Sequence, residues 1–305
     1  MKSEYEVIII GGGPAGLTAG LYTARGRLSS LLVERGMLGE QIANIVQLEN
    51  YPGFPEGIDG FELGQLMHRQ ATRFGLETLM ADATGVKLMG EKKVVTTTAG
   101  EFIAKGVIIA TGTIRRKLGI RGEEEFTGKG VSYCATCDAP FFTQKPVAIV
   151  GGDNAAVTEA LHLAKFASKV TLIHRRDQLR ISRVLKEKVS AEPKIEMLRN
   201  TAVDEIAGTA VVSQLKLHNV TNDETSALGV AGVFISIGLR PNTDFIKGVL
   251  SPDEAGQIVT NEKMETAVPG IFAAGDVRSN SAKQAITAAG DGATAAIYAE
   301  RFLGG

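Results

Sequence analysis

The stretch EVIIIGGGPAGLTAG, residues 6–20, joins an apolar, largely β-branched run to a cluster of glycines and then to a segment with helical spacing. Such a run is typical of a buried parallel strand, and the apolar spacing after it predicts a helix over Pro14 to Arg25. Gly11, Gly13 and Gly16 fall where strand turns into helix, so that backbone N–H groups can approach a pyrophosphate. The stretch therefore predicts a dinucleotide-binding strand–turn–helix unit.

The acid at the end of the next expected strand indicates which nucleotide this turn accepts. Glu34 ends the run SLLVERG, residues 30–36, and lies 23 residues after Gly11. A carboxylate at about this distance hydrogen-bonds a free ribose 2′-hydroxyl. We therefore interpret the glycines and Glu34 as a site for a nucleotide that lacks a 2′-phosphate, the alternative being an ordinary tight turn with a surface glutamate.

A second strand, glycine turn and helix, AIVGGDNAAVTEAL at residues 148–161, is followed by a strand that ends differently. His174 occupies the place 23 residues after Gly151, where the first turn has its glutamate. Three arginines follow His174: Arg175, Arg176 and Arg180. Their guanidinium groups can bind a 2′-phosphate through charge-assisted, bidentate hydrogen bonds. This turn is therefore predicted to accept a 2′-phosphorylated nucleotide, with a solvated basic strand end as the alternative.

One residue of the second turn opposes anion binding. Asp153 follows Gly151 and Gly152 at the place of the fingerprint's second glycine. Two like charges about 4 Å apart repel by about 1 kcal/mol in water and by about 4 kcal/mol at an effective dielectric constant of 20. We expect Asp153 either to weaken nucleotide binding or to point to solvent.

Alternating strand and helix patterns predict an α/β fold of two doubly wound, Rossmann-like nucleotide-binding domains, the second inserted into the first. The run GIFAAGDV, residues 270–277, and a long helix over residues 281–303 with Ile286, Ala289, Ala293 and Ile297 on one face complete the first domain. The first domain is expected to span residues 1–114 and 246–305, and the inserted domain residues 115–245, joined through TIRRKLG (113–119) and LRPNTD (239–244).

Both cysteines of the chain lie in VSYCATCDAPFF, residues 131–142. A zinc site needs about four ligands, and the four histidines are scattered singly, so redox chemistry is the better reading of Cys134 and Cys137. This spacing permits a small disulfide loop and lowers the pKa of one thiol, and Asp138 can return the proton that thiol–disulfide exchange requires. A flavin suits electron transfer from a nucleotide to a disulfide.

Net charge and the distribution of apolar residues limit the kinds of partner that we expect. A formal net charge of -1 gives no global reason to bind nucleic acid or an anionic membrane. The apolar run after Met1 is too short for a membrane span or a signal peptide, so we expect a cytoplasmic protein with reduced thiols.

Length, motif order and the CATCD centre together resemble the low-molecular-weight thioredoxin reductases of bacteria and archaea over the whole chain. The resemblance implies an FAD site, with Asp276 on the ribityl side, in which Glu40 replaces a usual glycine. The residues that it assigns to FAD are Gly11, Gly13, Gly16, Glu34, Gln41, Asn50, Thr111, Gly112, Gly275, Asp276, Lys283, Gln284 and Ala285. Those that it assigns to NADPH are Gly151, Gly152, Asp153, His174, Arg175, Arg176 and Arg180.

The resemblance also implies a mechanism. Cys137 is expected to take electrons from the flavin, and Cys134 to attack the disulfide of a thioredoxin-like protein, with Asp138 as acid and base. It further implies a homodimer and an inserted domain that rotates on its linkers.

Other readings stay open. The turn GGDNAA departs from the family's second fingerprint, and some relatives use ferredoxin or a deazaflavin instead of NADPH, although they have typically lost the arginines. NADH, a ferredoxin–NADP reductase-like flavoprotein and a non-enzymatic redox sensor are the remaining alternatives.

Overall fold

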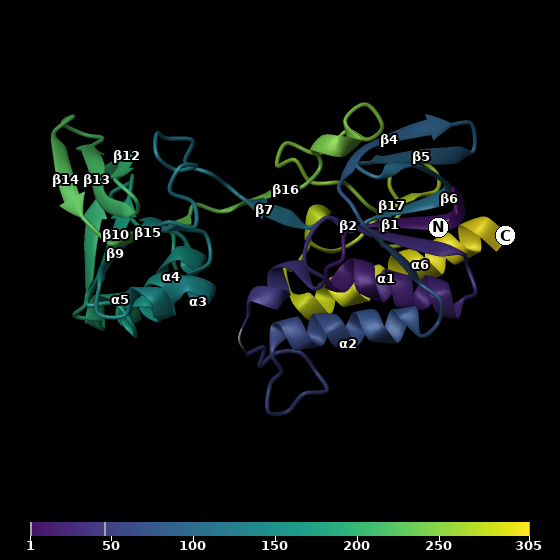
Figure 1. Ribbon diagram of the computed structural model, residues 1–305, viewed down its shortest axis with the longest axis horizontal. Coiled ribbons are helices and arrows are strands. Elements are labelled where there is room, and N and C mark those ends of the chain that lie inside the picture. The colour runs from purple at the N-terminus through teal and green to yellow at the C-terminus, as the bar shows by residue number, and fades with distance from the viewer. Residues whose placement is uncertain (1, 46, 305) are drawn as a thin grey trace. The chain divides into compact units, whose positions relative to one another are not determined.

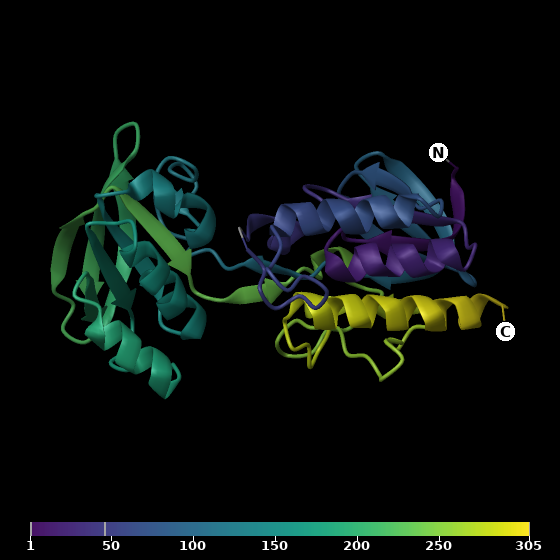
Figure 2. The same cartoon turned by 90° about the horizontal axis from the view of Figure 1, so that it is seen from below.

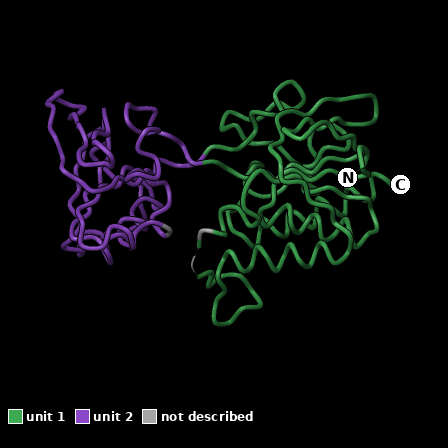
Figure 3. Tube along the Cα trace, in the orientation of Figure 1, with its two compact units in different colours: residues 1–114, 240–305 green, residues 115–239 purple. Residues whose placement is uncertain are grey.

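The computed structural model describes residues 2–45 and 47–304, except for the side chains of Asn44 and Cys137. The chain divides into unit 1, Met1–Ile114 with Arg240–Gly305, and unit 2, Arg115–Leu239 (Figure 3). The second junction thus lies at 239/240 and not at the expected 245/246. Asn242 explains the difference, because its N–H donates to the Gly112 carbonyl at 3.1 Å and its carbonyl accepts from Thr111 Oγ1 at 2.8 Å.

Unit 1 is built on a parallel sheet of order β3-β2-β1-β6, with β17 also parallel to β6. β5 and β4 extend the sheet in antiparallel order. Val7 to Ile10 of β1 are all buried, which explains the unbroken apolar run. The strands are β1 (Glu4–Ile10), β2 (Ser30–Glu34), β3 (Glu77–Met80), β4 (Ala83–Met89), β5 (Lys92–Thr97), β6 (Gly100–Ile109) and β17 (Ile271–Ala273).

Three helices of unit 1, α1 (Pro14–Arg25), α2 (Gly60–Thr72) and α6 (Ala285–Gly304), lie together on one face of this sheet (Figures 1 and 2). α1 and α6 approach closely because small residues meet: a Cβ on Gly292 would lie 2.0 Å from the Ala15 carbonyl oxygen. The face expected for α6 is only partly the one that packs on α1, since Ala289 is 6% exposed in the core shared with α1 whereas Ile286 and Ile297 are 41% and 37% exposed.

Unit 2 contains a wholly parallel sheet of order β11-β10-β9-β15-β8. The apolar runs PVAIVG, KVTLIH and GVFIS form its central strands. The strands are β8 (Val131–Ser132), β9 (Pro146–Gly151), β10 (Lys169–His174), β11 (Ile195–Arg199) and β15 (Gly232–Ser236), and the helices are α3 (Ala135–Asp138), α4 (Asn154–Ala164) and α5 (Arg183–Ala191).

A three-stranded antiparallel sheet in unit 2 was not predicted. It consists of β12 (Thr201–Gly208), β13 (Val212–Asn219) and β14 (Thr225–Gly229). Its buried Ile206, Leu215 and Leu217 share a core with Val150 and Val233 of the parallel sheet. The antiparallel sheet therefore covers apolar side chains of the parallel one.

The chain crosses between the units twice, and the crossings pair as strands β7 (Thr113–Arg115) and β16 (Leu239–Pro241). Both expected linker segments lie at these crossings. Across the described residues, no helix combines the length and the apolar character needed to traverse a bilayer.

Candidate functional site

The first glycine turn joins β1 to α1, and two of its glycines are required by close packing. Gly11 has a φ of +107°, and a Cβ on Gly16 would lie 1.8 Å from the Gly11 carbonyl oxygen. Gly13 differs, because a Cβ there would meet no atom nearer than Glu40 Cβ at 3.8 Å. The turn therefore lets α1 begin against the end of β1 and leaves open space beside Gly13, as a dinucleotide requires.

Glu34 lies at this turn, 3% exposed at the end of β2. One carboxylate oxygen accepts the Gly12 N–H at 2.5 Å and the other accepts the Gly36 N–H at 2.7 Å. These bonds fix the carboxylate at a cavity of about 340 Å³. The cavity is lined by Ile10, Gly11, Val33, Glu34, Arg35, Glu40, Ala81, Asp82, Ala83, Thr84, Thr111, Asn242, Asp244 and Phe245. Turn, acid and cavity together fit a dinucleotide.

Other residues assigned to the flavin come together from distant segments of unit 1. Asn50 Nδ2 donates to Gln284 Oε1 at 3.2 Å across 234 positions of sequence. Gln41 Nε2 lies 3.0 Å from the carbonyl oxygen and from Oγ1 of Thr113. Lys283, with a φ of +55°, lies in the loop before α6, which begins at Ala285. Gly112 adopts a φ of +57° between the end of β6 and β7.

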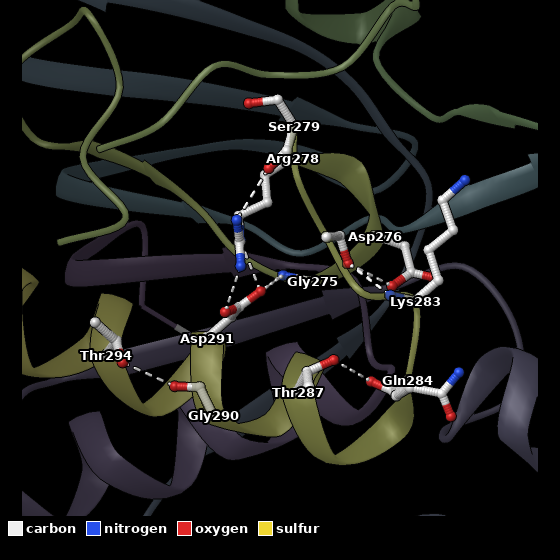
Figure 4. Close-up of polar contacts among 11 residues, drawn as sticks. Gly275, Asp276, Arg278, Ser279, Lys283, Gln284, Thr287, Gly290, Asp291 and Thr294 are labelled. Atoms are coloured by element: carbon white, nitrogen blue, oxygen red, sulfur yellow. Dashed lines mark hydrogen bonds and ion pairs between the residues drawn. The ribbon is translucent and has the colours of Figure 1, made fainter. Parts of the chain in front are cut away.

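The short helix η4 (Gly275–Val277) carries the expected Gly275 and Asp276 pair (Figure 4). Ser281 Oγ donates to Asp276 Oδ1 at 3.0 Å. Burial raises the pKa of Asp276, whereas the Ser281 hydrogen bond and the charge of Lys283 oppose that rise. Asp276 is therefore held beside the loop that precedes α6.

A charged pair under this loop was missed by the sequence reasoning. Arg278 donates two hydrogen bonds to Asp291 of α6, Nε to Oδ2 at 2.7 Å and Nη2 to Oδ1 at 2.8 Å. Asp291 Oδ2 also accepts the Gly275 N–H at 3.1 Å, as Figure 4 shows. The only local signal was an acid in a helix otherwise rich in Ala and Gly, AAGDGATAA at residues 288–296. Asp291 therefore anchors η4 to α6.

In the second turn, Asp153 is exposed, but its carboxylate is bound to the backbone of the helix that follows. It is the N-cap of α4, and its Oδ1 accepts the Ala156 N–H at 3.0 Å. The carboxylate thus occupies a backbone donor at the helix terminus where a pyrophosphate would bind. A bound nucleotide would meet this fixed negative charge.

His174 and Arg180 bring the basic strand end to the second glycine turn. A Cβ on Gly152 would lie 2.1 Å from the His174 ring, and the Arg180 N–H donates to the Gly152 carbonyl at 2.9 Å. Burial lowers the pKa of His174, the hydrogen bond to the Gln178 backbone opposes this shift, and the charges of neighbouring arginines add to it. Arg175 and Arg176 are exposed beside this histidine. The sequence offset of 23 residues therefore corresponds to adjacency in space, as expected.

Cys134 follows β8 and is disulfide-bonded. Its N–H donates to Ser132 Oγ at 3.0 Å, and its carbonyl accepts the Asp138 N–H at 3.1 Å. Ser132 is 5% exposed and was not singled out from the sequence. Cys137 and Asp138 belong to the next turn, α3, but the Cys137 side chain lies outside the described residues. Within residues 2–45 and 47–304, no group of three or more His, Cys, Asp or Glu is placed to hold a metal ion.

A family model described as pyridine nucleotide-disulphide oxidoreductase matches residues 5–292. The chain belongs to this oxidoreductase family. Membership implies a flavin and a pyridine nucleotide as cofactors, and the glycine turns of both units fit such groups.

Relatives of the same oxidoreductase family share almost the whole chain. The thioredoxin reductase of Peptoclostridium acidaminophilum is 44% identical over 99% of this chain and 98% of its own length. The thioredoxin reductase of Streptomyces coelicolor is 46% identical over 99% of this chain and 95% of its own length. The crystal structure of the Lactococcus lactis thioredoxin reductase matches with a TM-score of 0.88 at 43% identity, over 98% of this chain and 99% of that one. The expected fold class and the resemblance to thioredoxin reductases are confirmed.

Proposed function

We propose that this protein is an FAD-dependent thioredoxin-disulfide reductase that takes electrons from NADPH. The observation that carries the proposal is the disulfide-bonded Cys134 in a CxxC sequence, in a chain with two glycine turns whose strand ends carry opposite charge. Full-length similarity to thioredoxin reductases supports thioredoxin as the substrate.

The first turn suits FAD. Glu34 would accept a hydrogen bond from the ribose 2′-hydroxyl of FAD, and the space beside Gly13 would take the pyrophosphate. Asp276, Lys283, Gln284 and Ala285 would face the ribityl and ring end of the flavin. When bound, the flavin supplies two-electron transfer between a nicotinamide and a dithiol.

The dithiol performs the exchange with thioredoxin. The Cys134 thiolate attacks one sulfur of the thioredoxin disulfide, which forms a mixed disulfide and releases the other sulfur as a thiolate that takes a proton from Asp138. Cys137 then attacks the Cys134 sulfur. This step breaks the mixed disulfide, restores the Cys134–Cys137 disulfide and releases thioredoxin as a dithiol, so two electrons leave the protein.

The nucleotide donor is tested by anaerobic mixing of the FAD-loaded protein with NADPH and, separately, with NADH while flavin absorbance is followed. Rapid bleaching by NADPH alone supports the proposal. Bleaching by neither nucleotide, in protein that dithionite still reduces, would point instead to reduced ferredoxin or a deazaflavin. Bleaching by NADPH without thioredoxin reduction would favour a ferredoxin–NADP reductase-like role.

Replacing both Arg175 and Arg176 with Ala should raise the Michaelis constant for NADPH by roughly ten- to a hundredfold, because charge-assisted hydrogen bonds to the 2′-phosphate are lost. The constant for NADH, which lacks this phosphate, should change little. Arg121→Ala, which removes an arginine of unit 2 that is 84% exposed, is the matched control. Equal effects on both nucleotides would contradict the assignment of the arginines.

Asp153→Gly should tighten NADPH binding about fivefold, the factor expected when one charge at about 4 Å in water is removed. Glycine is itself an acceptable N-cap, so α4 should lose only a few tenths of a kcal/mol. Equilibrium binding of NADPH measures the effect, and Asp153→Asn, which keeps the cap but not the charge, separates the two contributions. Unchanged binding in both variants would show that the carboxylate does not face the nucleotide.

We further propose that the protein is a homodimer that acts in the reducing environment of the cytoplasm. Exposed Ile286 and Ile297 on α6 lie on the same unit as a cavity of about 270 Å³ lined by Tyr22 and Tyr51. Apolar surface of this kind favours association with a second copy.

A further inference from the structure

Glu40 begins the short helix η1 (Glu40–Asn44) in a backbone conformation that glycine normally adopts. Its φ is +47°, directly after Gly39 at +95°, and the Gly39 N–H donates to the Gly12 carbonyl at 2.8 Å. A side chain with a Cβ is uncommon in this region. The chain therefore retains an acid at a position where its backbone favours glycine.

The Glu40 side chain lies near Gly13 of the first glycine turn and near Gly112, which follows β6. Its Cβ is 3.8 Å from the Cβ position of Gly13, and its Oε2 is 4.0 Å from that of Gly112. The Gly12 N–H also faces its carboxyl group. The space beside Gly13 is where a pyrophosphate would bind, so the Glu40 side chain borders the space that this anion would occupy.

The charges around Glu40 are mostly negative. Burial raises the pKa of Glu40 well above the ordinary value, and the charge and hydrogen bonding of Glu34 raise it further. The Arg35 charge and the Gly12 N–H oppose this rise without cancelling it. Two further acids, Asp82 and Asp244, line the same cavity from exposed positions. Burial and the neighbouring acids therefore favour the neutral form of Glu40 more than they would for an ordinary exposed glutamate.

We propose that Glu40 is an affinity-determining residue for FAD: its carboxyl group borders the pyrophosphate and admits it fully only when neutral. This inference rests on the proposed binding of FAD at the first turn. FAD should thus bind more weakly than it would to a turn with glycine at position 40, and more weakly as pH rises.

The sign of the pH effect follows from the added anion. Bound pyrophosphate is a further negative neighbour, so it raises the pKa of Glu40 above that in the flavin-free protein. Affinity is therefore full below the pKa of the flavin-free protein and falls as pH rises through it, until the higher pKa of the complex is reached.

The test is equilibrium dilution of the full-length FAD-loaded protein, in which released FAD is followed by its fluorescence from about pH 5.5 to about pH 8.5. Wild-type affinity should fall at least about fivefold over this range, the factor for one like-charge contact at about 4 Å in water. Glu40→Gln should abolish this fall, and Glu40→Gly should bind FAD at least as tightly as the wild type does at the acid end. Glu56→Gln, at an exposed glutamate of the same unit, is the matched control and should follow the wild type.

The possible outcomes separate the two proposals. Equal affinity and equal pH dependence in wild type, Glu40→Gln and Glu40→Gly, with FAD bound in each, would overturn the role of Glu40 alone. Wild-type affinity that rises with pH would mean that the carboxyl group leaves the turn on binding, and would also overturn it. Failure of every variant to retain FAD would overturn the proposed cofactor as well.

Discussion

Cys134→Ser is expected to lower thioredoxin reduction by roughly a thousandfold or more while flavin reduction by the nucleotide continues. Removal of an attacking nucleophile costs several orders of magnitude, because no other group can form the covalent intermediate. A serine hydroxyl is far less nucleophilic than a thiolate at neutral pH. Reduction of the flavin does not use this sulfur, so the variant should still bleach with NADPH and pass electrons to a small dye.

The measurement compares steady-state thioredoxin reduction with the rate of dye reduction in the same preparation. Thr136→Ala is the matched control, since it alters a residue between the two cysteines without removing a thiol. Undiminished thioredoxin reduction by Cys134→Ser would exclude Cys134 as the attacking sulfur. Loss of dye reduction as well would indicate damage to the flavin site and not to the exchange step.

Asp291→Ala is expected to lower the free energy of unfolding of unit 1 by about 3 to 5 kcal/mol. The Arg278 and Asp291 side chains are only 16% and 10% exposed, so the deletion leaves a largely buried guanidinium without its carboxylate. The Gly275 N–H loses its acceptor at the same time. Because η4 carries Asp276, the variant should also retain less flavin.

Amide hydrogen exchange of β6 and β17 measures this loss within unit 1. The Arg278→Leu, Asp291→Leu double variant should be less damaging than the sum of its single changes, because replacing both partners removes the unpaired charge. Glu187→Ala breaks an exposed pair with Arg183 on α5 and should change stability by less than about 0.5 kcal/mol. A similarly small effect for Asp291→Ala would mean that η4 is held by other contacts.

The sequence predicted those strands and turns that are determined by residues close together in the chain. The run from Val7 to Ile10 shows a buried parallel strand, and Gly16 is required by the carbonyl of Gly11, five residues earlier. Glu34 was found because strand length and helix length fix its distance from the turn. The strand β10 likewise brings His174 to Gly152.

The features that were missed depend on contacts between distant segments. The antiparallel strands β12 and β13 have eight residues each but are only partly buried, so their apolar alternation was weak; their buried residues pack with Val150 and Val233 of the parallel sheet. The buried face of α6 is made of alanine and glycine and carries little hydrophobic signal, while exposed Ile286 and Ile297 gave the stronger one. Arg278 and Asp291 are separated by enough chain that only the fold reveals their pairing.

The discontinuity of unit 1 has a consequence for biosynthesis. Unit 2, Arg115–Leu239, is continuous and emerges complete while unit 1 still lacks β17 and α6. Until those elements follow, the face of α1 that receives Gly292 is uncovered and the loop with Gly275 and Asp276 does not exist. During translation unit 2 can therefore fold first, and the flavin site is the last part of the protein to form.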